Sequence, residues 1–309
     1  MKQKFLFLSF IIFSFLLSFT ACKKNETIPV DNTDEVTAQS DDQFSFSSET
    51  DAVANDADLA LETNSYFANR SEQVMSVICD ATITADTLSN PRTITITYNG
   101  ANCRGNRTRT GVVVLSMAAG VHWKNAGAAI TVTYQNLKIT RMADNKSITI
   151  NGAHTITNVS GGLLFNLATL GTITHTITSS GMSVKFNDES QRTWQVAKQR
   201  VFSYQNGAVI TTTGIHSEGN ATNIAEWGTN RFGHAFSSAI IEPLVVRQDC
   251  DFRLVSGKIK HTAHAIVATA TFGLDVHGIP TTCPGAGHYY FKVEWMGING
   301  NSHSFILPY

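Results

Sequence analysis

The sequence predicts an all-β protein with a large antiparallel body, meander-like or sandwich-like, and one short N-terminal helix. Two patterns carry this prediction. Apolar residues alternate with threonine, lysine or glutamate over short runs, which is typical of antiparallel strands with one packed and one solvated face. Turn signals such as Asn99-Gly100 and Asn151-Gly152 separate these runs. No strand–helix–strand alternation is present, which argues against a parallel sheet.

Five runs show the alternation most plainly: residues 94–98, 130–134, 148–150, 173–177 and 289–295. Threonine supplies many of the solvated positions, because its branched β-carbon suits extended backbone. We expect roughly a dozen strands within residues 74–309. No Pro-rich or Gly/Ser-rich linker divides this stretch, so a single domain is expected.

Residues 1–21 have the features of a secretory signal peptide, with two lysines, an apolar run over 5–19 and small residues before Cys22. The apolar run is shorter than the roughly 18 to 20 residues needed to span a bilayer. The cleavage region resembles a bacterial lipoprotein signal, which implies that Cys22 is the mature first residue and carries acyl chains such as palmitate. Lys23 replaces the Asp that would favour the inner membrane, which implies the outer membrane. An ordinary signal peptide that releases a soluble protein is the alternative.

Charge is unevenly distributed, although the whole chain carries a net charge of only −1. Residues 23–73 hold 12 Asp and Glu against 3 Lys and Arg, a net charge of −9. Residues 74–309 hold 18 Lys and Arg against 12 Asp and Glu, a net charge of +6. Because the positive charges form no basic run, nucleic acid is not an expected partner.

Residues 22–46 are polar and acidic with few large apolar residues, so they predict a flexible tether. Residues 47–73 hold the expected helix and its lead-in to the body. The helix is expected over 48–64, where apolar residues recur every four positions from Val53 to Leu61. Because this apolar stripe is modest, the helix is expected to lie against the edge of the body.

Four cysteines besides Cys22 predict two disulfides, since an even number is typical of an oxidising compartment. Four cysteines allow three pairings. We expect Cys79 with Cys103 and Cys250 with Cys283, because each pair then belongs to one half of the body. Buried thiols that are not bonded to each other are the alternative.

The two halves of the body share an order of features, namely a strand, a Gly-containing loop, a cysteine, a Gly-rich turn and a second strand. The order runs over residues 98–115 with Cys103 and over residues 272–295 with Cys283. It is consistent with two related halves inside one domain. A chance likeness between two Gly-rich hairpins is the alternative.

Four segments together resemble a family of uncharacterised bacterial lipoproteins of the Gram-negative, outer-membrane type: residues 98–114, 228–236 and 250–257, and the hairpin around Cys283. The resemblance covers most of residues 75–309. It implies the lipoprotein signal, the acidic lead, the short helix and a Cys-bearing β-rich body. It implies no activity and no catalytic residue.

Two groups of side chains are candidates for ligand binding. Arg107 and Arg109 share a face of an extended segment and could bind an anionic sugar or lipid headgroup, and a solvated hairpin edge is the alternative. Trp227 stands beside a glycine in a turn-like stretch and is the best candidate for an exposed carbohydrate platform. Trp295 alternates with apolar neighbours and is expected in the core.

Motifs for metal binding or catalysis are weak. His277, Cys283 and His288 flank one loop near Asp275, but their spacing matches no zinc signature. The chain lacks a Gly-x-Ser-x-Gly elbow, a His-Glu-x-x-His motif and a phosphate-binding Gly-Lys-Ser/Thr loop. We therefore predict no metal, no cofactor and no catalytic residue.

The sequence thus predicts an outer-membrane lipoprotein, on the periplasmic face or at the cell surface. The expected role is a non-enzymatic binding or structural module, attached to the membrane through Cys22, whose partner is a glycan or an envelope protein. The alternative is a hydrolase that acts on polysaccharide or cell-wall material. Two facing carboxylates in a cleft, or a Ser–His contact, would favour the hydrolase.

Overall fold

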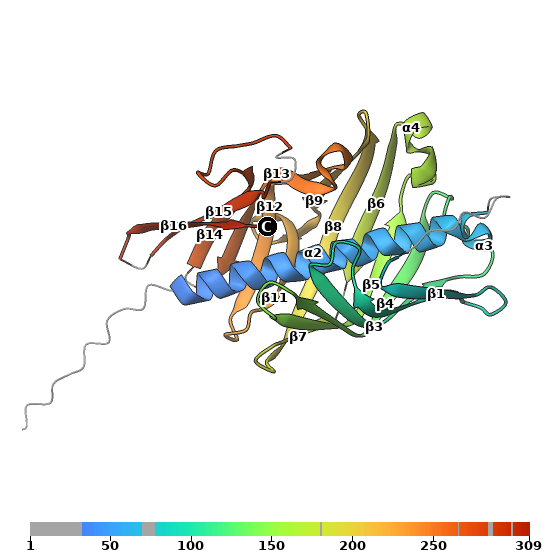
Figure 1. The fold of residues 1–309 in the computed structure, drawn as a ribbon, viewed down its shortest axis with the longest axis horizontal. Coiled ribbons are helices and arrows are strands. Elements are labelled where there is room, and N and C mark those ends of the chain that lie inside the picture. The colour runs from blue at the N-terminus through green and yellow to red at the C-terminus, as the bar shows by residue number, and fades with distance from the viewer. Residues whose placement is uncertain (1–32, 70–77, 180, 265, 284–286, 298) are drawn as a thin grey trace, which may run out of the picture. The chain divides into compact units, whose positions relative to one another are not determined.

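A computed structural model describes residues 33–69, 78–179, 181–264, 266–283, 287–297 and 299–309. The predicted signal peptide, Cys22 and the first part of the predicted tether lie outside the described residues. The described chain is mostly β, with all strands in one antiparallel sheet of 16 strands (Figure 1). The predicted fold class is therefore confirmed, in its meander form.

Strand order in the sheet largely follows the chain, because most neighbours are joined by hairpins. The first eight strands are β1 (Ala81–Asp86), β2 (Arg92–Ala101), β3 (Arg107–Met117), β4 (Ala128–Arg141), β5 (Ser147–Asn158), β6 (Thr172–Ser179), β7 (Met182–Phe186) and β8 (Gln191–Tyr204). The other eight are β9 (Ala208–Gly214), β10 (His216–Glu218), β11 (Ala221–Thr229), β12 (Ala235–Arg247), β13 (Arg253–Ala263), β14 (Ile266–Leu274), β15 (Tyr290–Met296) and β16 (Ser302–Pro308). β7, β9 and β10 pair beside the main path, and β1 and β16 are the two edge strands.

Helix α2 (Thr33–Thr63) is the main helix and crosses the strands from the side of β14–β16 toward the side of β1 (Figure 1). The short helices are α3 (Ser65–Ala68), α4 (Leu167–Leu170), η1 (Leu164–Asn166) and η2 (Gln248–Cys250). No helix among the described residues is long and apolar enough to cross a membrane.

Two sequence predictions about α2 are wrong. The helix begins at Thr33, so the part of the predicted tether from Thr33 to Phe46 is helical. It also lies against the middle of the sheet, because it bonds to side chains of β3, β4, β8, β11 and β12. Only four of its residues are exposed: Thr33, Asp34, Thr37 and Asn55. A segment that looks too polar to fold alone is ordered here because the sheet surrounds it with partners.

The apolar core fills the inner face of the sheet and the apolar side of α2. Its largest cluster joins Phe46, Val53 and Leu61 of the helix to inward residues of β2–β8, and Phe46 stacks on Trp194 at 4.6 Å. A second cluster packs Val36 against β14 and β15. Trp295 is 5% exposed in that cluster, which confirms its predicted place in the core.

The outer face of β2–β6 carries an uncharged row that we call the threonine face. Its five residues face one another in register across five neighbouring strands: Thr93, Ser116, Thr131, Thr155 and Thr178. All five are half-buried or exposed, whereas the residues that flank them along their strands are buried, apart from Ser179. This pattern is the one that the alternation of threonine with apolar residues predicts.

Gly273 shows how the sheet accommodates a local bend. Its φ is +79°, and a Cβ there would lie 1.9 Å from the carbonyl oxygen of Val255 on the neighbouring strand. The register between β14 and β15 shifts between Thr271 and Leu274, at this point of the chain. Only glycine combines that φ with so close an approach.

Candidate functional site at the interface of helix α2 and the sheet

Helix α2 is an acidic helix enclosed by a sheet that supplies cations. It contains no Lys, Arg or His. Its nine carboxylates are Asp34, Glu35, Asp41, Asp42, Glu49, Asp51, Asp56, Asp58 and Glu62. Most of them face a cationic or hydrogen-bonding group of the sheet, so this interface holds most of the buried charge of the described chain. Any chemistry of the inner face has to come from these groups.

Arg109 is fully engaged within the chain. Its Nε and Nη2 each donate to Asp80 at 2.7 Å, and its Nη1 donates to Asp56 at 2.8 Å. The guanidinium also lies over the ring of Tyr98, whose hydroxyl donates to Asp56. Arg109 is 6% exposed, so it cannot bind the external anion that the sequence suggested. The shared face of Arg107 and Arg109 is real, but it points at α2.

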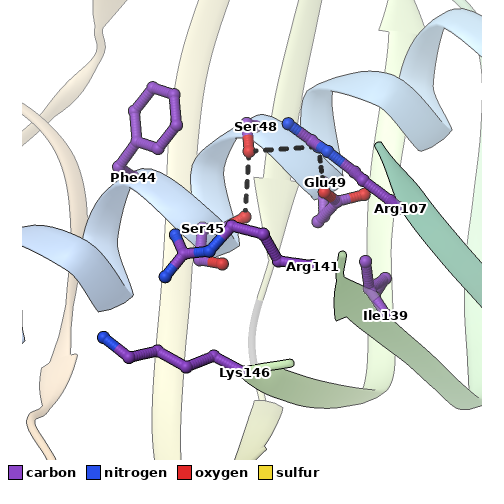
Figure 2. Close-up of a pocket in the computed structure, with 8 residues that line it drawn as sticks. All are labelled: Phe44, Ser45, Ser48, Glu49, Arg107, Ile139, Arg141 and Lys146. Atoms are coloured by element: carbon purple, nitrogen blue, oxygen red, sulfur yellow. Dashed lines mark hydrogen bonds and ion pairs between the residues drawn. The ribbon is translucent and has the colours of Figure 1, made fainter. Parts of the chain in front are cut away.

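The small pocket of Figure 2 lies where α2 meets the ends of β3 and β4. Eight residues line it: Phe44, Ser45, Ser48, Glu49, Arg107, Ile139, Arg141 and Lys146. Its volume of about 20 Å³ suits one water molecule. The pocket therefore has no room for a sugar ring or a headgroup.

The cations around this pocket are neutralised by the helix and by one loop. Arg107 is hydrogen-bonded to Glu49, and Arg141 donates to Asp41 at 2.8 Å. Lys146 lies 3.0 Å from Asp41. Burial opposes the charge of Asp41, but Arg141 and Lys146 outweigh it and lower its pKa. Burial raises the pKa of Glu49 in spite of Arg107.

Glu226 and Lys198 form the most deeply buried ion pair, near the middle of α2. Lys198 Nζ lies 2.6 Å from Glu226 Oε1, and the two side chains are 3% and 1% exposed. Glu226 also accepts hydrogen bonds from Trp194 Nε1 at 2.8 Å, from Ser47 at 2.6 Å and from Gln43. Burial lowers the pKa of Lys198, but the nearby carboxylates outweigh it and raise that pKa overall. The pair ties β8 and β11 to the helix.

A Ser–His contact, which would favour a hydrolase, does occur beside this pair. Ser238 Oγ lies 2.9 Å from His261 Nδ1, but the hydroxyl donates its proton to Gln43 Oε1 at 2.8 Å. The hydroxyl therefore accepts from Nδ1–H, so this ring nitrogen cannot act as its base. Ser238 is 1% exposed beneath α2, and burial lowers the pKa of His261 to about 4. The contact thus supports packing of the helix and lacks the geometry of a nucleophile.

The β11–β12 hairpin holds the start of α2. Arg231 donates to Asp42 at 2.6 Å and 2.8 Å, and Asn230 donates to Glu35 at 2.7 Å. His234 Nδ1 also lies 2.7 Å from Glu35. These residues come from the 228–236 segment that carries the family resemblance. Sequence reasoning missed their role, although the opposite charges of residues 23–73 and 74–309 were a signal for it.

The tryptophans do not form one exposed platform. Trp123 and Trp194 are fully buried, and Trp295 lies in the core. Trp227 is half-buried in β11 and stacks on His216, with ring centroids 4.1 Å apart. The structure therefore leaves Trp227 as a single partly exposed aromatic residue.

The disulfides have the pairing that the sequence predicts, Cys79 with Cys103 and Cys250 with Cys283. Among the described residues, one cluster has the donor types for a metal ion, and it consists of Asp249 with Cys250 and Cys283. Both sulfurs of that cluster are used in the disulfide. Asp275 accepts hydrogen bonds from the backbone of His277, so its carboxylate shapes the loop there.

Comparisons with protein-family models, with curated proteins and with solved structures found no match to this chain. The resemblance to uncharacterised lipoproteins therefore stays a prediction. The candidate site is therefore described by the contacts between α2 and the sheet, which hold this helix in place.

Proposed function

We propose that this chain is an exported, lipid-anchored protein of the outer membrane that acts as a non-enzymatic binding or structural module. The observation that carries the proposal is the contrast between the two faces of the sheet. The inner face is filled by α2, most of whose charges are paired with groups of the sheet, whereas the outer face of β2–β6 presents an uncharged row of hydroxyl and methyl groups. A catalyst needs reactive groups where substrate can reach them, and the ionisable groups of the interior lie under the helix.

Export is supported by the two disulfides, because such bonds persist in oxidising compartments. Attachment is supported by the sequence around Cys22, since two or three acyl chains on one residue give stable anchoring. The anchor would keep the protein at the periplasmic face or the cell surface of the outer membrane.

The threonine face is the proposed contact surface, and its proposed partner is a neutral glycan or an envelope protein. A hollow of about 370 Å³ lies on this face, lined by Thr131, Ala153, His154, Thr155, Thr178 and Ser179. Because no charged side chain stands in the row, an anionic polymer such as nucleic acid finds no counter-charge there. Hydroxyl groups can both donate and accept hydrogen bonds, as the hydroxyls of a neutral sugar can.

Among the described residues, the hydrolase alternative is favoured only by the contact between Ser238 and His261. For that contact to act, α2 would have to leave the sheet and Ser238 would have to reverse its hydrogen bond. We therefore retain the binding module as the proposed function.

Intact mass of the protein recovered from its native membrane tests the anchor. We expect the mass of a chain that starts at Cys22 with two or three acyl chains, and a gain of about 4 Da on reduction, two hydrogen atoms for each opened disulfide. Cys22→Ser is the control and should yield an unacylated chain. An unacylated wild-type protein, or no gain on reduction, would overturn the proposed compartment.

Co-sedimentation with insoluble neutral polysaccharides and with isolated outer membranes tests the contact surface. Thr155→Lys places a charge in the hollow and should reduce binding at least tenfold. Thr269→Lys, on the outer face of β14 away from the row, is the matched control and should leave binding unchanged. Release of soluble sugar from the particles would support the hydrolase instead.

A further inference from the structure

Within the part of the chain that the structure describes, strand β16 forms one edge of the sheet and pairs only with β15. Tyr309 N–H donates to Tyr289 at 2.9 Å, and Asn301 accepts from Gly297 at 2.8 Å. In an antiparallel pair, alternate residues direct their backbone groups toward the same neighbour. The odd-numbered residues of β16 therefore bond to β15, and the even-numbered ones direct their N–H and C=O groups away from the sheet.

Ser302, Ser304 and Ile306 thus present an open row of backbone donors and acceptors. No strand of the described residues pairs with β16 on the side to which these backbone groups point. Ser302 and Ser304 are exposed. β16 carries no Lys, Asp or Glu, and charged side chains are the usual protection of an edge strand against pairing with another chain.

The strand is self-complementary about Phe305. If a second β16 runs antiparallel beside the first with Phe305 at the two-fold axis, Ser304 of each copy faces Ile306 of the other. These two residues are the ones whose backbone groups point outward, so each facing pair makes two hydrogen bonds. Ser302 N–H then faces Pro308, which lacks an N–H but has the carbonyl that Ser302 needs.

The same arrangement covers apolar side chains of the inner face. Phe305 is partly buried against Trp295, and Leu307 is 37% exposed. The two-fold pairing sets Phe305 against Phe305 of the second copy, at the closer, non-hydrogen-bonded spacing where aromatic pairs contribute most. In the other edge strand, β1, the same two-fold pairing would place Thr84 at the axis, and the strand ends at the charged residue Asp86. The β16 edge therefore suits self-association better.

We propose that two copies of this chain associate through their β16 strands, Ser302 to Pro308, in a two-fold antiparallel pair that extends the sheet from one copy into the other. Such a closed, isologous contact yields dimers. The proposal concerns an edge remote from the threonine face, so it stands or falls independently of the proposed function.

The test compares Ser304→Pro with Ser304→Ala in the full-length protein in detergent, by native mass spectrometry and sedimentation. Proline removes an N–H that the single copy does not use and is tolerated at such edge positions. Wild type and Ser304→Ala should be dimers, whereas Ser304→Pro should dissociate roughly 10- to 100-fold more readily, because each dimer loses two hydrogen bonds. An unchanged thermal melting profile would show that Ser304→Pro still folds.

Cross-linking and hydrogen exchange identify the register and the occupant. Ser304→Cys with Ile306→Cys in one chain should form a disulfide-linked dimer on oxidation, whereas Ser304→Cys alone should not. A monomeric wild-type protein would overturn the proposal. In a monomer, slow hydrogen exchange of the Ile306 amide would mean that another part of the chain covers the edge, and rapid exchange would mean that the edge is open to solvent. A dimer that Ser304→Pro leaves intact would also overturn it and would assign association to another surface.

Discussion

Removing one member of the Glu226–Lys198 pair is the sharpest perturbation of the helix–sheet interface. Glu226→Gln leaves Lys198 charged, 3% exposed and without its nearest counter-charge. Truncating one partner of a buried ion pair typically costs about 3 to 5 kcal/mol. Gln retains a carbonyl oxygen that can accept from Trp194 and Gln43, so the hydrogen-bond loss adds only part of the roughly 1 to 3 kcal/mol that an unsatisfied group costs.

A double-mutant cycle separates the pair from the rest of the site. Lys198→Met alone should be destabilising by a similar amount, because it leaves the Glu226 carboxylate buried. The double variant Lys198→Met with Glu226→Gln removes both charges of the pair. Its loss in free energy of unfolding should be smaller than the sum of the losses in the two single variants. We expect a coupling energy of at least about 2 kcal/mol from such a contact.

The assay is urea unfolding followed by tryptophan fluorescence, in which buried Trp194 reports the undocking of α2. Each variant is compared by its midpoint at constant slope. A cost below about 1 kcal/mol for Glu226→Gln, or single costs that simply add in the double variant, would refute the buried pair as a determinant of docking.

Three further outcomes follow from single features. Replacing Cys79 and Cys103 by Ala should reduce the free energy of unfolding by about 3 to 4 kcal/mol, the value for a loop of this length, and an unchanged urea midpoint would contradict it. Burial lowers the pKa of His154 to about 3, so its ring stays neutral in the fold and stability should fall once the pH drops below the unfolded pKa of about 6.5. His154 should contribute about 2 kcal/mol to the loss of stability between pH 7.5 and pH 5, so urea unfolding at each pH should show a loss smaller by this amount in His154→Gln than in the wild type. Gly273→Ala should lower stability by at least about 2 kcal/mol in thermal unfolding, because its Cβ would meet the Val255 carbonyl at positive φ, and an unshifted melting temperature would contradict this.

The strands could be predicted because their information is local. Residues 94–98 and 130–134 alternate with the two-residue period of a sheet, and they lie in β2 and β4 with apolar residues inward. The cysteine pairing could be predicted because each pair belongs to one half of the body. Both inferences needed only short stretches of sequence and one physical rule.

The enclosed helix could not be predicted by the same reasoning. The segment from Thr33 to Phe46 has the composition of a disordered tether, and its helical state depends on Arg141, Lys146 and Arg231, which are far away in the chain. Arg109 likewise looked available to an external anion, because its neighbours in the sequence give no sign that Asp56 and Asp80 lie beside it in the fold. The clue was global: the −9 and +6 net charges of the two parts of the chain are of opposite sign.

The enclosure of α2 also sets an order of events during folding. Glu35 bonds to His234, 199 residues further along the chain. An isolated helix with nine carboxylates and no cation is unstable in water, and Glu35 and Asp42 acquire their partners only after the β11–β12 hairpin has formed. Contacts this distant in sequence form slowly, because a long loop must close before they contribute. Helix α2 is therefore among the last parts of the described chain to be fixed, although it precedes every strand of the sheet in the sequence.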